Sequence, residues 1–562
     1  MKNMVNLLKK EKFNFLLPII FFLVATVVIL WQMLLPGYIL TLDMVFTPKV
    51  KVFLDQSLIQ NTLPIKYLLQ IINYIIPGWL IQKIIIILIF FLSGFLGYLF
   101  LPGVKKLGMN YWVGLFLMAN PFVYERFLAG HWMHLIAYAF LTPLSLFIIN
   151  FSKNPNFKNT SGLALLLFLV GVFSVHFLAI SLILTFIYLL IIFIKLVIQK
   201  QYLKVKKIFI YSIVATIIIL ILSSYWLIPY FLNQNNHLNN FNQKDWQTFA
   251  TAGDLEFGTT LNVLGLYGFW AEYHPWADYF LWPKANLGWV ILLGFLLFLA
   301  LIGLCSSWKS KKSEELIFFL TAGIIGFIFS AGVGDTIFKT LNQFMFENIW
   351  FWPGFRDSQK WSGLLVISYA YFVSLGIYQT LKYLSDILKV EARKIIIFSF
   401  LIPILYTYTI WGGFSRQLKP VWYPESWHQV NEILNQDSSH FKALFLPWHQ
   451  YLSLNFNQKL ISQNPAKDFF DKPIIQGENP EVGQIYSQSV DLDVKAVENI
   501  LLQTRGDKNI SIIPGLKKVG IKYIIFSNDL AGIDQDFSFN SYDFSQIKAI
   551  IKSEELVLYQ IL

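Results

Sequence analysis

The residue whose type and position first suggest chemistry is Asp43. It stands in the segment Tyr38-Ile-Leu-Thr-Leu-Asp-Met-Val-Phe46, a few residues after the first long apolar stretch and among apolar neighbours. A carboxylate held at a membrane face can accept a proton from a sugar hydroxyl or coordinate a divalent cation. The alternative is a solvated loop acid that caps the following helix.

Two cations, Arg356 and Lys360, lie four residues apart just before another apolar stretch. If a helix begins near Arg356, the two side chains share one face of it. Two cations beside a helix N-terminus suit a phosphate group, because the exposed backbone N–H groups add to the positive field. The alternative is that Asp357 caps the helix and pairs with Lys360, while Arg356 reaches the membrane interface.

A third group of ionisable residues, Glu125, Arg126 and His131, lies where Pro121 and Gly130 interrupt helical segments. Ionisable side chains at membrane depth are costly unless they face a cavity or one another. We interpret Arg126 as a candidate donor-binding cation, and Glu125 and His131 as candidates for an acceptor or cation site. A local Glu125–Arg126 pair beside a hydrogen-bonded His131 is the structural alternative.

A fourth candidate is the acidic pair Asp254 and Glu256. Their side chains would point the same way in an extended segment, where they could bind a cation or an acceptor sugar. Acidic pairs in loops are also commonly just solvated. His176 is a lone histidine between two apolar stretches, which indicates a structural role.

The elements that must position these residues are membrane-spanning helices. The 562-residue chain is 56% hydrophobic and only 14% charged, and it contains repeated apolar stretches of about 20 residues, the length that crosses a bilayer. We predict about eleven spans, near 16–35, 79–101, 112–127, 134–151, 162–178, 180–199, 208–230, 286–306, 316–334, 362–383 and 395–412. The fold class is therefore a polytopic α-helical membrane protein, with a transmembrane core over 1–412.

The distribution of positive charge predicts the orientation. With a cytoplasmic N-terminus, one side holds twenty Lys and Arg residues in short loops, and the opposite side holds ten in much longer loops. Under the positive-inside rule, the long loops 36–78, 233–285 and 335–361 face outward. The net charge of +11 thus reflects topology, and we expect no nucleic-acid partner. A single cysteine excludes a disulfide within the chain or a cysteine-cluster metal site.

Two features of the outward regions follow from residue spacing. In the first loop, 49–60 and 64–76 have apolar residues at helical spacing, which predicts two helices along the membrane surface. From 413 to 562 the composition becomes that of an extracytoplasmic, water-soluble α/β domain. We expect strands at 443–446, 523–527 and 557–560 and helices at 425–434 and 494–503.

This layout resembles the GT-C superfamily of membrane glycosyltransferases, in particular the proteins proposed to glycosylate lipoteichoic acid and the cell-wall arabinofuranosyltransferases. The resemblance rests on the loop with Asp43, the segment 120–131, and Phe355-Arg-Asp-Ser-Gln-Lys-Trp361, where the family often has an aromatic-Arg-acid-x-x-Lys-aromatic pattern. Tyr423-Pro-Glu-Ser-Trp427 and Leu446-Pro-Trp-His-Gln-Tyr451 also look like segments of its members. Many members carry two adjacent acids in the first loop, whereas Asp43 has apolar neighbours, so the need for a divalent cation such as Mg²⁺ or Mn²⁺ stays open.

The resemblance implies transfer of a sugar from a polyprenyl-phosphate donor to a glycan, lipid or protein acceptor outside the cytoplasm, with inversion. Asp43 would deprotonate the acceptor hydroxyl, and Arg356 with Lys360 would neutralise the departing lipid phosphate. Two alternatives remain at the level of sequence. A transporter or flippase of cell-envelope precursors also carries charged residues near many spans, and a non-catalytic scaffold could use the exported domain to bind envelope partners.

Overall fold

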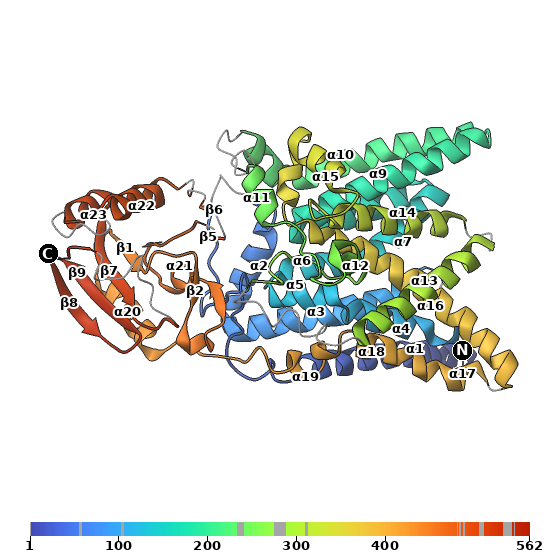
Figure 1. The fold of residues 1–562 in the computed structure, drawn as a ribbon, viewed down its shortest axis with the longest axis horizontal. Helices are drawn as coiled ribbons and strands as arrows, with labels where there is room; N and C mark the ends of the chain where they lie inside the picture. The colour runs from blue at the N-terminus through green and yellow to red at the C-terminus, as the bar shows by residue number, and fades with distance from the viewer. Residues whose placement is uncertain are drawn as a thin grey trace.

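The computed structural model describes residues 2–54, 59–102, 106–232, 241–274, 288–309, 313–389, 391–479, 481–482, 485–486, 489, 491–504, 511–531, 542–544 and 546–562. It consists of a bundle of apolar helices with an α/β region at one end (Figure 1). Among the described residues, seven helices are long and apolar enough to cross a membrane, or eight if one bent pair counts as a span. The chain is a multi-pass membrane protein, and the predicted count of eleven spans is not confirmed.

The helices of the bundle follow the apolar stretches of the sequence. Their bounds are α1 (Lys2–Leu30), α3 (Gly78–Phe100), α4 (Met109–Met118), α5 (Pro121–Leu128), α6 (Trp132–Ala139), α7 (Leu141–Lys153), α8 (Phe157–Phe173), α9 (Val175–Ile198), α10 (Tyr202–Leu232), α13 (Gly288–Lys309), α14 (Ser313–Ser330) and α16 (Ser362–Leu388). Short helices then lead to the C-terminal region, namely α17 (Ala392–Ile395), η6 (Ile396–Phe400), α18 (Leu401–Tyr406), η7 (Tyr408–Ile410) and α19 (Trp411–Phe414).

Three predicted spans are wrong as continuous helices, and one of them, at 162–178, is interrupted at Ser174 between α8 and α9. The span at 112–127 is broken into α4 and α5, because Asn120 caps α5 by accepting from the Val123 N–H at 3.1 Å and Pro121 follows at its first position. The span at 395–412 is bent by 79° between Tyr406 and Tyr408. The break at Asn120 is important for function, since it leaves a short helix whose far end carries Glu125 and Arg126.

The loops between the spans hold shorter helices. They are α2 (Leu63–Asn73), η1 (Lys106–Gly108), α11 (Gln243–Thr248), α12 (Gly258–Leu264), α15 (Lys339–Asn348), η4 (Trp352–Phe355) and η5 (Ser358–Trp361). Helix α2 confirms that the second of the two predicted loop helices forms, and it buries no residue and leaves Ile71 63% exposed. The other predicted helix, at 49–60, is wrong over 49–54, which is not helical, and its residues 55–58 lie outside the described part.

The C-terminal region is built on a five-stranded mixed sheet in the order β4-β1-β7-β9-β8. These strands are β1 (Lys442–Leu446), β4 (Ile474–Ile475), β7 (Ile521–Ser527), β8 (Ile547–Lys552) and β9 (Leu556–Ile561). The central strands β1 and β7 are parallel, and β9 lies antiparallel to β7. The predicted strands at 443–446, 523–527 and 557–560 are therefore confirmed.

Helices cover both faces of this sheet, because side chains alternate across each strand. Leu444 and Leu446 pack with α22 (Leu492–Thr504) and α23 (Ile513–Val519), whereas Ala443 and Phe445 pack toward α20 (Glu425–Gln436). The predicted helices at 425–434 and 494–503 are thus also confirmed. The smaller elements are β2 (Tyr451–Ser453), η8 (Asn455–Asn457), β3 (Ile461–Gln463), α21 (Ala466–Phe469), β5 (Glu481–Val482) and β6 (Ile485–Tyr486).

The first loop joins the helical bundle to the C-terminal region. The backbones of Tyr38 and Val421 exchange two hydrogen bonds of 2.7 and 2.9 Å. Further along, Lys49 forms an ion pair with Asp471 at 2.6 Å, and the Tyr423 hydroxyl donates to the Phe46 carbonyl at 3.0 Å. The loop that carries Asp43 is consequently fixed from both sides.

Candidate active site

The backbone around Asp43 is held by the short helix α5. The Asp43 N–H donates to the Ala129 carbonyl at 3.2 Å, and the Thr41 hydroxyl donates to the Leu128 carbonyl at 2.6 Å. Gly130 makes this close approach possible, since its φ is +77° and a Cβ there would lie 2.2 Å from the Met44 nitrogen. The acid is therefore positioned by backbone contacts that tolerate no side chain at residue 130.

Both oxygens of the Asp43 carboxylate accept a hydrogen bond. His131 Nε2 lies 3.1 Å from Oδ2, and the Tyr451 hydroxyl lies 2.6 Å from Oδ1. The side chain nevertheless remains 44% exposed, so one side of the carboxylate faces open space. Partial burial acts to raise the pKa of Asp43, but the bonds from His131 and Tyr451 and the charge of Lys360 together hold this pKa below its ordinary value. Asp43 is thus an accessible carboxylate that is ionised at neutral pH.

Behind His131 lies a fully buried ion pair between Arg126 and Asp357. The guanidinium binds both carboxylate oxygens of Asp357, one of them at 2.8 Å, and its Nε donates to Gln359 Oε1 at 2.7 Å. The ring of Phe269 lies against the guanidinium, with its centroid 5.1 Å from the Arg126 Cζ. This bidentate pair joins the end of α5 to the Phe355–Trp361 segment, which is more than 200 residues away in sequence.

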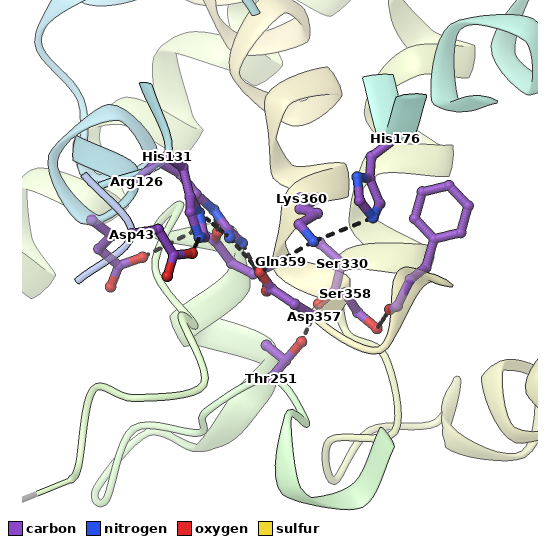
Figure 2. Close-up of polar contacts among 12 residues, drawn as sticks. Asp43, Arg126, His131, His176, Thr251, Ser330, Asp357, Ser358, Gln359 and Lys360 are labelled. Atoms are coloured by element: carbon purple, nitrogen blue, oxygen red, sulfur yellow. Dashed lines mark hydrogen bonds and ion pairs between the residues drawn. The ribbon is translucent and has the colours of Figure 1, made fainter. Parts of the chain in front are cut away.

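The pair also determines the tautomer of His131. Arg126 Nη1 lies 3.1 Å from His131 Nδ1, and because a guanidinium only donates, Nδ1 must be the unprotonated acceptor. The ring proton therefore sits on Nε2, which donates to Asp43. Burial and the charge of Arg126 lower the pKa of His131, in agreement with a neutral ring. A continuous chain of hydrogen bonds thus runs from Asp43 through His131 and Arg126 to Asp357 (Figure 2).

Lys360 lies at the other end of this chain, beside Asp357 and His176 (Figure 2). Its ammonium group is 3.7 Å from Asp357 Oδ2, beyond hydrogen-bond distance, and 3.5 Å from His176 Nε2. That ring nitrogen lies closer to the Gly354 carbonyl, at 3.0 Å, and must donate to it. Lys360 therefore has donors left for an anionic ligand, although its side chain is only 12% exposed.

The expectation that Arg356 and Lys360 share a helix face is wrong. Asp357 has a ψ of 82°, which interrupts the helical conformation, and α16 begins only at Ser362. Arg356 instead pairs with the buried Asp245 at 3.3 Å. Its guanidinium also lies between the rings of Phe241 and Phe249, whose centroids are 4.1 and 4.4 Å from Cζ. Asp357 likewise makes no capping bond, because Arg126 takes both of its oxygens.

Three further candidates lie apart from the carboxylate of Asp43. Glu125 is fully buried and accepts from Gln359 Nε2 at 3.0 Å, so it faces the interior of the protein. Asp254 accepts from the N–H groups of Glu256 and Phe257 at 2.9 and 3.0 Å. The segment is therefore a turn, not the extended strand in which Asp254 and Glu256 would align.

The donor set does not suit a divalent cation. Within the described ranges, no three His, Cys, Asp or Glu side chains are grouped so that they could hold a metal ion. Asp357 is already bound by Arg126, and Asp245 by Arg356. We therefore derive no catalytic step through Mg²⁺ or Mn²⁺.

Some residues of the site have no interpretable signal in the sequence by themselves. Tyr451 lies 408 positions from Asp43, and only the resemblance of its segment to GT-C members singled it out. Gln359 binds both Arg126 and Glu125, yet an isolated glutamine predicts neither contact. Within the family-like pattern, Asp357 and Gln359 thus serve to attach the Phe355–Trp361 segment to α5.

Comparisons with known proteins bear on the fold. No protein-family model and no curated protein matches this sequence. The structure is similar to the cryo-EM structure of the arabinofuranosyltransferase AftD from Mycobacteria, with a TM-score of 0.59 and 11% identity over 97% of this chain. A variant of that mycobacterial protein matches with a TM-score of 0.58 and 13% identity, again over 97% of this chain. The chain spans 40% of the AftD chain in the first comparison and 41% in the second. This likeness shows that the chain shares the fold of the mycobacterial arabinofuranosyltransferase structures over nearly its whole length.

Proposed function

We propose that this chain is a membrane glycosyltransferase that moves a sugar from a polyprenyl-phosphate-linked donor to an extracytoplasmic glycan, lipid or protein acceptor. The observation that carries the proposal is that an accessible carboxylate, Asp43, and a cation with donors left for a ligand, Lys360, belong to one site. They are connected by successive contacts through His131, Arg126 and Asp357. A base and a phosphate-binding cation are the two groups that such a transfer needs. The GT-C fold supports the same class of reaction.

Asp43 is the general base in this proposal. His131 and Tyr451 each occupy one lone pair of the carboxylate, and each oxygen keeps another for the acceptor hydroxyl. As the hydroxyl oxygen attacks the anomeric carbon, its proton passes to Asp43 and the bond between that carbon and the phosphate oxygen breaks. Attack from the face opposite the phosphate inverts the configuration of the anomeric carbon.

Lys360 receives the departing phosphate. A preorganised cation at the position where negative charge develops lowers the barrier by several kcal/mol, comparable to the loss of one oxyanion donor at about 3 kcal/mol. Arg126 already binds both oxygens of Asp357. It therefore contributes to donor binding indirectly, by holding the Phe355–Trp361 segment that carries Lys360. Arg356 contributes through its field, because it is already paired with Asp245.

Membrane orientation follows from the same proposal. The cytoplasmic side carries the Lys-rich short loops, and the α/β region lies outside the cytoplasm. The lipid tail of the donor stays in the bilayer, where the apolar side chains of Ile71 in α2 and of Ile75, which follows α2, remain exposed to receive it. The sugar and phosphate then reach Asp43 and Lys360 at the membrane face, and the acceptor approaches from the α/β region.

The test is turnover by the purified chain in lipid nanodiscs. Short polyprenyl-phosphate pentoses and hexoses are supplied with an extract of bacterial envelope glycans, and release of polyprenyl phosphate is measured. We expect turnover of at least one donor by the wild type and loss of about 1,000-fold or more in Asp43→Asn, since its base is removed. Asp386→Asn, an exposed acid at the far end of α16, is the matched control.

Three outcomes separate the proposal from its alternatives. Equal turnover in the wild type and Asp43→Asn would reject Asp43 as the base. Vectorial movement of a fluorescent polyprenyl phosphate without cleavage would instead indicate a flippase. Binding of glycans without either activity would indicate a scaffold.

A further inference from the structure

The loop that carries Asp43 also forms a β-bridge with the C-terminal region. The Leu42 N–H donates to the Ile461 carbonyl at 2.9 Å, and the Gln463 N–H donates to the Leu42 carbonyl at 2.8 Å. Leu42 thereby extends the two-stranded sheet of β2 and β3 on its β3 edge. Because Leu42 immediately precedes Asp43, the C-terminal region fixes the backbone from which the carboxylate projects.

The backbone of Leu42 is strained, so the contacts that attach it to the C-terminal region must offset this strain. Its φ is +37°, in a region that side chains other than glycine rarely occupy. A strained residue of this kind persists only where the surrounding contacts outweigh the strain. The contacts that do so here are the two hydrogen bonds to β3.

A side chain of the C-terminal region completes the contact. Tyr451, the first residue of β2, donates its hydroxyl to Asp43 Oδ1 at 2.6 Å. This bond is shorter than the 3.1 Å bond from His131, and the two bonds go to different oxygens of the carboxylate. The two bonds come from different regions of the molecule, since His131 follows α5 and Tyr451 follows the sheet strand β1.

We propose that Tyr451 is a positioning residue of the active site, which orients the Asp43 carboxylate and keeps it ionised, so that the C-terminal region is a component of the catalytic centre. This inference rests on the proposed function only in that Asp43 is taken as the base. It adds that the base becomes competent when the α/β region is seated on the first loop.

The charged and titratable groups that face Asp43 determine the sign of the effect. They are His131 from the α5–α6 connection, Tyr451 from β2 and Lys360 from η5. A donated hydrogen bond favours the charged form of a carboxyl group. Removal of the Tyr451 hydroxyl therefore moves protonation of Asp43 to higher pH, while His131 and Lys360 stay in place.

The experiment is the pH profile of polyprenyl phosphate release in Tyr451→Phe, measured on the full chain in nanodiscs with a donor that the wild type uses. We expect the acid limb of the profile to move to higher pH by about one pH unit, as for loss of one charge-assisted hydrogen bond to a carboxylate. Turnover above the limb should fall while KM for the donor stays within a factor of two. An acid limb at the wild-type pH would overturn the proposal.

Tyr423→Phe is the matched control. Its hydroxyl also joins the first loop to the C-terminal region, but the 3.0 Å bond that it makes goes to the Phe46 carbonyl and not to the Asp43 carboxylate. The two variants lose the same chemical group from the same interface. An equal displacement of the acid limb in both would mean that loosening of the interface is responsible, which would also overturn the proposal.

A spectroscopic measurement separates this inference from the proposed function. The infrared band of the protonated Asp43 carboxyl is isolated as the difference between the wild type and Asp43→Asn over a pH titration. In a Tyr451→Phe background, the same band should appear at higher pH, whether or not any donor is turned over. A band that appears at an unchanged pH would refute the role of Tyr451, whereas a displaced band without turnover would refute only the transferase proposal.

Discussion

Replacement of Gly130 by alanine should inactivate the site without unfolding the protein. The added Cβ would lie 2.2 Å from the Met44 nitrogen, 2.5 Å from the Thr41 carbonyl oxygen and 2.8 Å from the Asp43 nitrogen, whereas ordinary contacts begin at 3.4 Å. All three atoms belong to the loop that carries Asp43. To relieve the overlap, this loop must move by about 1 Å away from α5, a misplacement that costs about 100-fold in rate.

The same substitution adds backbone strain of about 1–2 kcal/mol, because residue 130 has a φ of +77°. Gly520→Ala serves as the control for this term, since Gly520 has a φ of +86° but no atom within 4 Å of an added Cβ. We expect both variants to lose similar thermal stability in nanodiscs. Only Gly130→Ala should lose polyprenyl phosphate release by about 100-fold. Near-normal turnover in Gly130→Ala would refute the idea that this close approach positions Asp43.

Three other predictions concern the buried chain of charges. Asp357→Asn leaves the Arg126 guanidinium buried without its counter-ion, so the free energy of unfolding should fall by about 3–5 kcal/mol. A denaturant series in detergent would measure this, and a loss below about 1 kcal/mol would contradict a buried bidentate pair. Lys360→Met should weaken use of the donor at least tenfold more than Arg356→Met, because Lys360 has free donors and Arg356 is bound by Asp245. Equal losses of turnover in Lys360→Met and Arg356→Met would mean that Arg356 also binds the phosphate.

The remaining prediction of this group is a two-stage loss of stability in acid. The pKa of His131 is lowered in the folded protein, so stability should begin to fall below about pH 6.5, where the unfolded chain takes up the proton first. The pKa values of Asp43 and Asp357 are also lowered, so their contribution is complete above about pH 4 and is lost as pH falls further. Thermal melts across pH should show a smaller upper stage in His131→Gln, because one of the buried histidines is removed, and should retain the lower stage.

The architecture was largely predictable from residue periodicity, because bilayer crossing and sheet packing impose strong patterns. Helix α20, for example, follows from apolar residues at helical spacing, and strand β1 follows from a short apolar run. The segment 49–54 shows the opposite case. Its spacing is helical, yet Asn73 accepts from the Val50 N–H at 2.8 Å and Lys51 donates to the Phe470 carbonyl, so tertiary contacts override the local pattern.

The site residues were identifiable as types, but their pairings were not. Asp43, Arg126, His131 and Lys360 attract attention as polar residues beside apolar stretches. Which of them touch depends on packing between elements hundreds of residues apart, and local spacing contains no such information. The ion pair between Asp357 and its neighbour Lys360, which was the alternative interpretation, is present at 3.7 Å, but the closer pair with Arg126 was not predicted.

The strand pairing of Leu42 has a consequence for biosynthesis. The partners of this loop, β2 and β3, are synthesised about 400 residues after it. At about 5–20 residues per second, the first loop waits about 20–80 s for them. During that interval the bundle can insert and pack, but the loop around Asp43 lacks the hydrogen bonds that offset the strain at Leu42. If Asp43 is the base, as proposed, the nascent chain is an incomplete catalyst until β2 and β3 have been synthesised.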